Sequence, residues 1–133
     1  MLFVIFCLII SDLIEQFFEE INAMNIGSNI LITGGLGFIG SYFAEKISLE
    51  KRVIILDNFS ANSKEAYEFL NGRKNITIFD EDILFCDYAN YLPNINTVFH
   101  FAANSDISSG VDNPQVDFEI TTKGTHRLLT SMQ

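Results

Sequence analysis

Three glycines spaced three residues apart are the residues of this sequence whose types and positions most clearly suggest chemistry. Gly34, Gly37 and Gly40 lie where an apolar, β-branched run leads into a helical pattern, within residues 29–41. Gly34 would allow a sharp turn, Gly37 a close approach of the backbone to a pyrophosphate, and Gly40 tight packing of the helix on the strand. The free N–H groups at the start of that helix would form an anion site. We interpret the stretch as a phosphate-binding turn, with a tight turn that binds no ligand as the alternative.

A carboxylate follows the glycines at the distance expected for a dinucleotide site. Asp57 ends a second apolar run, residues 53–56, roughly 20 residues after the glycine turn. A carboxylate in this place can accept hydrogen bonds from the hydroxyls of an adenosine ribose. The next residue is Asn58, and no lysine or arginine appears before Lys64. Because a 2′-phosphate is usually met by a nearby arginine, this arrangement favours NAD over NADP.

Apolar runs and helical patterns alternate along the chain from residue 29 onward. We expect strands at residues 29–33, 53–56, 75–79 and 97–101, and helices at residues 41–49, 62–70, 84–92 and from Pro114 to the C-terminus. Such alternation predicts an α/β fold with a Rossmann-type, doubly wound parallel sheet that is truncated after about four strands. The expected strand order is 3-2-1-4, with the ligand at the switch between strands 1 and 4.

The composition of the chain limits which classes of molecule it is expected to bind. The chain has 133 residues, 48% of them hydrophobic, which is enough for one domain with a core. Its net charge of −9 argues against nucleic-acid binding, which needs a basic surface. Its two cysteines, Cys7 and Cys86, indicate neither a disulfide framework nor a metal site, so a cytoplasmic setting is the default expectation. The acidic residues 80–82 lack the ligand spacing of a cation loop, and we expect no metal.

Residues 1–24 precede this pattern, as an extension to a domain that we expect at residues 25–133. The apolar run at residues 1–10 is shorter than the roughly 20 residues that span a bilayer, and no basic residue or cleavage site marks a signal peptide. From Ile10 to Ile21 the apolar positions have helical spacing with an acidic opposite face, so no membrane binding is expected. Two interpretations stay open. The segment is an amphipathic helix that packs on the body or on a partner, or Met24 is the true start and the first residues come from a misread start codon.

Four motifs within residues 29–133 resemble those of a known family. They are TGGLGFIGS at residues 33–41, LDNFS at residues 56–60, the pair Asp82-Ile83, and HFAANSDI at residues 100–107 followed by Asp112-Asn113-Pro114 and KGTHRLL. In this order they resemble the extended short-chain dehydrogenase/reductases, in the NAD-dependent epimerase/dehydratase group, and within it the UDP-glucose 4-epimerase-like proteins. The resemblance implies NAD as cofactor and a nucleotide sugar as partner. It also implies oxidation of a sugar hydroxyl by NAD, followed by epimerisation or dehydration.

Carried over by position, the resemblance assigns cofactor contacts to each turn at the end of a strand. The glycine turn would hold the pyrophosphate through backbone N–H groups, and the residues after the second strand would hold the adenosine ribose. The residues after the third strand would flank the adenine, and those after the fourth would line the path toward the nicotinamide. The cofactor-binding residues expected are Gly34, Gly37, Phe38, Ile39, Gly40, Asp57, Asn58, Ser60, Asp82, Ile83, Phe101, Ala102 and Ala103. Thr121 stands where the family often has asparagine, so the resemblance does not establish a hydrogen bond to the cofactor at that position.

The residues that do the chemistry in this family are not found in the sequence. In the family, a serine or threonine and a Tyr-x-x-x-Lys pair follow the fifth strand and remove a proton from the sugar hydroxyl while hydride passes to NAD. Tyr42 and Lys46 have this spacing but directly follow the glycine turn, so we interpret them as a chance pair on a helix surface. We therefore expect no catalytic residues and a chain that is catalytically incomplete on its own. The alternatives are a non-catalytic dinucleotide-binding module and a truncated gene product.

Two further expectations concern the last third of the chain. His100 with Ser105 and Asp106 does not resemble a nucleophile elbow, so we expect His100 to be a structural residue at the end of a strand. The family resemblance also implies a homodimer, formed through helices that include the one reaching Gln133.

Overall fold

A four-stranded parallel sheet forms the centre of the computed structural model, which describes residues 16–21, 23–61 and 63–133. The strands are β1 (Asn29–Thr33), β2 (Arg52–Asp57), β3 (Ile76–Asp80) and β4 (Thr97–His100). Their order, β3-β2-β1-β4, confirms the predicted fold class and strand order. Thr33 at the end of β1 pairs with Leu56 of β2 and His100 of β4, so the carboxyl ends of these strands meet at one edge of the sheet.

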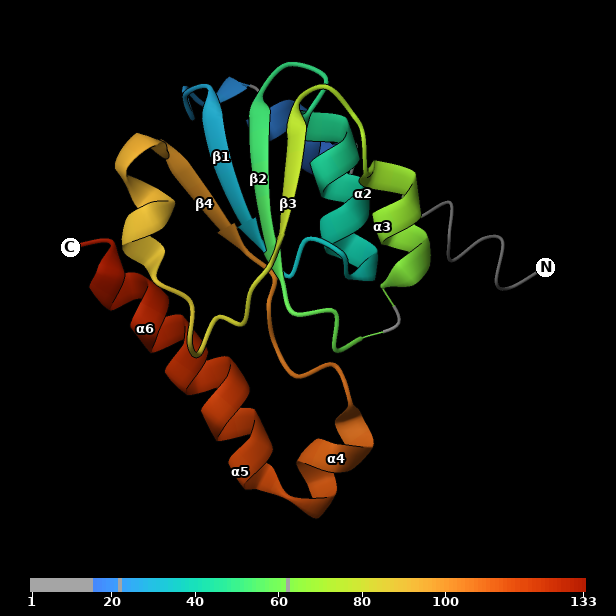
Figure 1. Cartoon of the computed structure of the whole chain (residues 1–133), viewed down its shortest axis with the longest axis vertical. Coiled ribbons are helices and arrows are strands. Elements are labelled where there is room, and N and C mark those ends of the chain that lie inside the picture. The colour runs from blue at the N-terminus through green and yellow to red at the C-terminus, as the bar shows by residue number, and fades with distance from the viewer. Residues whose placement is uncertain (1–15, 22, 62) are drawn as a thin grey trace.

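The sheet is covered on both faces, because the side chains of each strand alternate between the two faces. On one face, Ile30 and Ile32 of β1 share a core cluster with Phe43 of α2 (Phe38–Ile47) and with residues of α3 (Lys64–Leu70). On the other face, Leu31 of β1 packs in a second cluster with Leu128 of α6 (Gly124–Ser131). Figure 1 shows α2 and α6 on opposite sides of the strands.

The connection from β3 to β4 differs from the helix predicted at residues 84–92. It contains two short 3-10 helices, Tyr88–Asn90 and Leu92–Asn94. The Asp82 carboxylate accepts a hydrogen bond from Leu84 N at 2.8 Å, which closes a local turn at the start of this segment. Local bonds of this kind compete with the α-helical ladder, and Pro93 has no N–H to contribute to it. The apolar spacing of the segment therefore reflects packing against the sheet rather than an α-helix.

The helix predicted from Pro114 onward is present but is not regular. Pro114 is the first residue of α5 (Pro114–Asp117), which continues through a π-helical turn (Phe118–Lys123) into α6. A further helix that the sequence analysis does not predict, α4 (Ile107–Asp112), precedes it. The Asp106 side chain caps α4 by accepting a hydrogen bond from Ser109 N at 3.1 Å. Helices α4 and α5 project beyond the carboxyl edge of the sheet (Figure 1).

A helical segment at residues 16–21 precedes β1 and packs on the α2 face of the sheet. Ile21 belongs to the core cluster of that face, and Phe18 packs against it. The start of the predicted N-terminal helix and the apolar run at residues 1–10 lie outside the described residues, as does Asn62, where the second predicted helix begins. Within the described part of the chain, no helix is both long and apolar enough to cross a bilayer.

Candidate functional site

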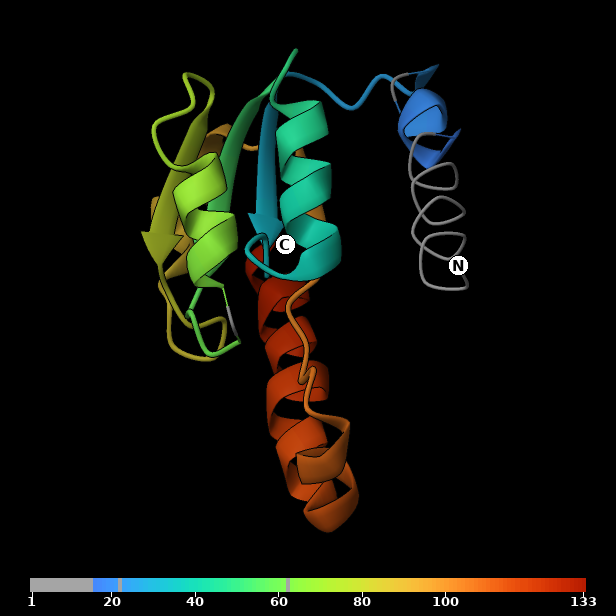
Figure 2. The ribbon, with the colours of Figure 1, turned by 90° about the vertical axis from the view of Figure 1, so that its right-hand side faces the viewer.

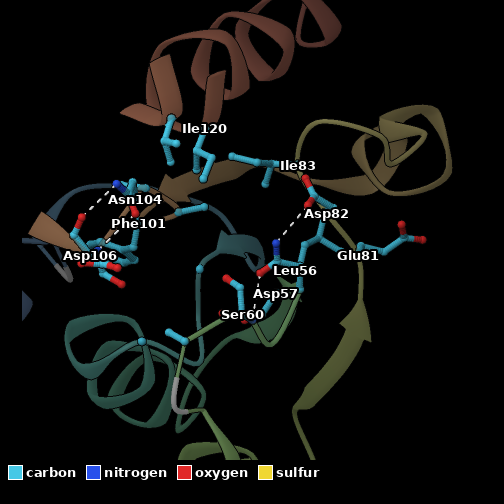
Figure 3. A pocket seen from close by; sticks show the side chains of 18 of the residues that line it. Leu56, Asp57, Ser60, Glu81, Asp82, Ile83, Phe101, Asn104, Asp106 and Ile120 are labelled. Atoms are coloured by element: carbon cyan, nitrogen blue, oxygen red, sulfur yellow. Dashed lines mark hydrogen bonds between the residues drawn. The ribbon is translucent and has the colours of Figure 1, made fainter. Parts of the chain in front are cut away.

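A pocket of about 390 Å³ opens at the carboxyl edge of the sheet, between the glycine turn and the loops that follow β2, β3 and β4. Figure 3 shows it from close by, with Asp57 and Asp82 on one side and Phe101, Asn104 and Asp106 on another. Val116 of α5 and Ile120 of the π-helical turn complete its lining, and Figure 3 shows Ile120 on the side of the pocket away from Ser60. The predicted switch between strands 1 and 4 therefore lies at a cavity with several polar groups on its wall.

The glycine turn is compact because its backbone folds back on itself. Gly34 has a φ of 67°, in the left-handed region, and its N–H donates to Leu56 O at 2.8 Å. A Cβ at Gly34 would lie 2.5 Å from Ala102 N, so only glycine allows the turn to lie against the loop after β4. A Cβ at Gly40 would overlap Gly34 O. Gly40 therefore packs against the turn rather than against the strand, which corrects the detail of the prediction.

The amino end of α2 lies at the pocket, because its N-cap residue Gly37 is on the pocket wall. Gly37 caps the helix without a side-chain hydrogen bond, and the first turn of α2 has no acidic residue. The first N–H groups of a helix have no partner within the helix and carry a partial positive charge. Phe38 and Ile39 are 77% and 55% exposed, so these two apolar residues at the start of α2 are not part of the core. This end of α2 can accept an anion.

The loop after β2 holds its polar side chains in fixed positions. The Asp57 carboxylate accepts hydrogen bonds from Leu36 N at 2.9 Å and from Phe59 N at 3.0 Å. Asn58 Nδ2 donates to Asp82 Oδ2 at 2.9 Å, which joins this loop to the loop after β3. Phe59 has a φ of 56°, an unfavourable value for a bulky residue, and it is held there by packing against the core. The two carboxylates at this end of the pocket are therefore preorganised.

The loop after β4 is held by Asn104 and by His100. Asn104 Nδ2 donates to Asp117 Oδ1 at 2.8 Å, and Asn104 N donates to Thr121 Oγ1 at 3.2 Å. His100 contacts the hydroxyls of Thr33 and Thr125 rather than Ser105 or Asp106, which agrees with the structural role predicted for it. Burial lowers the pKa of the His100 imidazole, so the ring is neutral near pH 7. These contacts fix the wall of the pocket between β4 and the helix that includes Thr121.

Most of the predicted cofactor-binding residues come together in the pocket. Those that line it are Gly34, Gly37, Asp57, Asn58, Ser60, Asp82, Ile83, Phe101, Ala102 and Ala103. Phe38, Ile39 and Gly40 are not on its wall but form the first turn of α2. Lining residues that the sequence analysis does not include are Leu56, Ala61, Glu81, Asn104, Ser105, Asp106, Ser109, Val116 and Ile120. Their signal in the sequence is weak: Asn104 to Asp106 lie shortly after the strand predicted at residues 97–101, and Val116 and Ile120 have helical spacing.

Two other candidate sites of the sequence are the Tyr42–Lys46 pair and the acidic residues 80–82, of which Glu81 and Asp82 line the pocket. Tyr42 and Lys46 lie on α2, where the Lys46 ammonium is 5.5 Å from the centre of the Tyr42 ring. Among the residues that the structure describes, the pocket wall has no tyrosine or lysine. The acidic residues 80–82 do not converge on one point, and no group of three or more metal-binding side chains occurs within the described ranges. The Tyr42–Lys46 pair is therefore not part of the pocket wall.

Comparison with known proteins identifies the family. The family model for GDP-mannose 4,6-dehydratase matches residues 31–133. The chain belongs to this family of NAD-dependent epimerases and dehydratases. It is 37% identical over 109 residues to a putative UDP-glucose 4-epimerase of Methanocaldococcus jannaschii, a match that covers 78% of this chain and 33% of the relative.

Solved structures of epimerases in this family have the same fold. One is a UDP-N-acetylglucosamine 4-epimerase from Methanobrevibacter ruminantium in complex with UDP-N-acetylmuramic acid, with a TM-score of 0.71 and 32% identity over 78% of this chain and 33% of that one. Another is a UDP-glucuronic acid 4-epimerase from Bacillus cereus in complex with UDP-glucuronic acid and NAD, with a TM-score of 0.70 and 26% identity over 77% of this chain and 35% of that one. The chain thus spans about a third of the length of these epimerases.

Proposed function

We propose that this chain forms the NAD-binding half of a nucleotide-sugar epimerase or dehydratase. The observation that carries the proposal is that the amino end of α2 and the carboxylate of Asp57 face one pocket. The first suits an anion and the second suits ribose hydroxyls, which is the pair of groups that a dinucleotide presents. Membership of the family supports NAD as that dinucleotide, and the names of the relatives support a nucleotide sugar as the partner.

We expect each part of the cofactor to bind a different part of the pocket. Backbone N–H groups of Phe38 and Ile39 would hold the pyrophosphate, and the space beside Asp57 and Ile83 would take the adenosine. The nicotinamide would then lie along residues 101–103, where Gly34 packs on Ala102 and leaves no side chain in the way. When bound, NAD supplies the acceptor for a hydride from a sugar hydroxyl. The residues of this chain bind and orient the cofactor.

The charges around the pocket support NAD rather than NADP. Its described wall includes the carboxylates of Asp57, Glu81, Asp82 and Asp106 and has no lysine or arginine. A 2′-phosphate placed beside Asp57 would meet a fixed negative charge with no cation to offset it. The unphosphorylated ribose would instead donate hydrogen bonds to the same carboxylate. We propose that the affinity for NAD exceeds the affinity for NADP by more than about tenfold, since one charged hydrogen bond contributes about 1.5–3 kcal/mol.

The groups that transfer protons are proposed to come from outside the described pocket. Its wall has neither of the two residue types of the family's Tyr-x-x-x-Lys pair. On this view the chain binds NAD but does not turn over a sugar by itself, and a non-catalytic dinucleotide-binding role is the alternative. A cytoplasmic location, a homodimer, and the lack of nucleic-acid and membrane partners stay predictions from the sequence.

Calorimetric titration of the chain with NAD tests the proposal. We expect saturable binding, and an affinity at least about tenfold lower for Asp57→Ala, because the ribose loses a charged acceptor. Asp80→Ala is the matched control, since Asp80 pairs with Asp57 in register at the end of β3 but does not line the pocket. Heat signals that do not saturate, or an equal loss in both variants, would contradict the proposal.

A further inference from the structure

We propose that a second pocket, at the amino edge of the sheet, binds a small anion of the diphosphate class, with two negative centres. This amino-edge pocket has a volume of about 390 Å³, and the residues that define it here are Arg52, Ile54, Lys74, Thr77, Asn94 and Ile95. The amino ends of β2 and β3 lie at the opposite end of the sheet from α4 and α5, as Figures 1 and 2 show. The inference concerns a site apart from the cofactor pocket and does not depend on the proposed function.

Positive charge gathers at this edge of the sheet, although the chain as a whole is acidic. Four of its eight lysines and arginines form two adjacent pairs, Lys51-Arg52 and Arg73-Lys74. The parallel pairing of β2 with β3 brings the residues at the starts of both strands to the same edge. Arg73 is paired with Glu45 at 3.0 Å, whereas Arg52 and Lys74 line the amino-edge pocket.

Carboxylates do not offset the charges of Arg52 and Lys74 at this pocket. Its described wall has no aspartate or glutamate, and no ion pair among the described residues includes Arg52 or Lys74. Asp57 ends the strand that Arg52 begins, but five residues at about 3.3 Å each separate them by about 17 Å. That distance exceeds the Debye length of about 8 Å at physiological ionic strength. An anion in the pocket would therefore be attracted by two cations that have no other partner nearby.

The side chains on the wall are donors that suit phosphate oxygens. The planar guanidinium of Arg52 can donate two parallel hydrogen bonds to one phosphate group, and the ammonium of Lys74 can pair with a second as a point charge. Thr77 and Asn94 add a hydroxyl and an amide to the same wall, and the hydrogen bonds of the described residues use neither side chain. Two cations with neutral donors beside them match an anion that has two charged centres.

An apolar side of the pocket strengthens its attraction for an anion. Alternate residues of a strand share a face, so Arg52 lies on the same face of β2 as Ile54. Ile54 and Ile95 pack against the core cluster that contains Leu31 and Leu56. On this side the pocket is closed by hydrocarbon rather than by water, which weakens the screening of charges. The same two cations on a flat, fully hydrated surface would hold an anion less strongly.

Titration of the full chain, labelled with ¹⁵N, with inorganic pyrophosphate tests the inference by NMR. We expect saturable shifts of the backbone amides at residues 52–54 and 74–77. Arg52→Gln and Lys74→Gln should each raise the dissociation constant by about tenfold, because each removes a charged donor. Both side chains are exposed, so both variants should keep a folded spectrum. Lys51→Gln is the matched control, since it removes a positive charge from the same edge but not from the pocket wall.

The controls decide whether binding is specific to the amino-edge pocket. An equal loss of affinity in all three variants, or shifts that do not saturate, would overturn the inference. Sulfate has one anionic centre and should bind at least about fivefold more weakly, and equal affinity would contradict a site for two centres.

The position of the shifts separates this site from the cofactor pocket, where the amino end of α2 can also accept an anion. Addition of NAD before the titration should leave the shifts at residues 52–54 and 74–77 unchanged. Shifts confined to residues 34–39 would overturn the inference. The titration without NAD tests the amino-edge pocket even if NAD does not bind to the chain, so the failure of one proposal is distinguishable from the failure of the other.

Discussion

The imidazole Nδ1 of His100 lies 2.5 Å from the hydroxyl oxygen of Thr33, across the pair of strands β1 and β4. On the other side of the ring, Nε2 lies 2.9 Å from Thr125 Oγ1, and the Thr125 hydroxyl donates to Thr121 O at 2.6 Å. Because Thr125 donates onward, it accepts from the Nε2–H of His100, and Nδ1 accepts from Thr33. This order of donors requires a neutral imidazole, which connects the ends of two strands to the last helix.

The neutral state of His100 makes stability depend on pH. Burial lowers the pKa of His100 in the folded state below 6.5, so the unfolded chain takes up this proton first as the pH falls. The stabilisation is complete above the unfolded pKa and is lost as the pH falls toward the folded one. In urea unfolding between about pH 7.5 and 5.5, we expect the free energy of unfolding to fall more steeply for the chain than for His100→Gln. His126 is present in both proteins and serves as an internal control, and equal pH slopes would contradict the prediction.

The loop after β2 should allow the cofactor preference to be changed. Replacing Asp57 by alanine and Asn58 by arginine removes a negative charge beside the ribose and adds a guanidinium that can pair with a 2′-phosphate. We expect the ratio of the NADP to the NAD dissociation constant to fall by about tenfold or more, as measured by calorimetry. Asp80→Ala combined with Lys64→Ala, outside the pocket wall, should leave the ratio unchanged.

Substitution of Gly40 should disturb the packing of α2 against the glycine turn. A Cβ in Gly40→Ala would overlap the carbonyl oxygen of Gly34, which cannot move without disturbing the turn. We expect a loss of about 1–3 kcal/mol in the free energy of unfolding, together with weaker NAD binding. The neighbouring Ser41→Ala, on the same helix, should change neither by more than about 0.5 kcal/mol. Denaturant titration and calorimetry measure the two quantities.

Replacement of Asn104 should weaken binding of the nicotinamide half of the dinucleotide more than binding of its ADP half. Its side chain holds Asp117, and its N–H holds Thr121, so Asn104→Ala should loosen the wall beside residues 101–103. We expect about a tenfold loss of affinity for NAD and little change for ADP, which lacks the nicotinamide part. Ser108→Ala, in α4 but not on the pocket wall, is the control. A similar loss for NAD and ADP would point to a general loss of structure instead.

Cys86 should react slowly with thiol reagents in the folded chain. Its side chain is buried, and burial raises the pKa of the thiol, so little thiolate is available at neutral pH. In a Cys7→Ser background, we expect reaction with a disulfide reagent to be at least about a hundredfold slower than in urea. Fast modification of the folded protein would show that the second core cluster opens readily.

Sequence patterns predict the sheet better than the helices around its carboxyl edge. Strands β1 and β2 are continuous apolar runs that end in a glycine turn or a carboxylate, so their place, order and pocket follow from local chemistry. The helix expected at residues 84–92 is wrong because side-chain bonds such as Asp82 to Leu84 N replace the helical ladder. The contribution of Asn104 was not predictable, since its partners Asp117 and Thr121 are brought to it only by the folded α4–α5 region.

The π-helical turn at Phe118–Lys123 determines how the side chains that follow it are oriented relative to those that precede it. A π-helical turn holds one more residue than an α-helical turn, so the side chains after it are rotated relative to those before it. Ile120 faces the pocket, whereas Leu128 faces the core, and Gly124 between them leaves room for Ile83. Deletion of a single residue from this turn would give a straighter helix that turns either its pocket half or its core half toward solvent. The extra residue therefore allows one continuous helix to contact the pocket with its first half and the core with its second half.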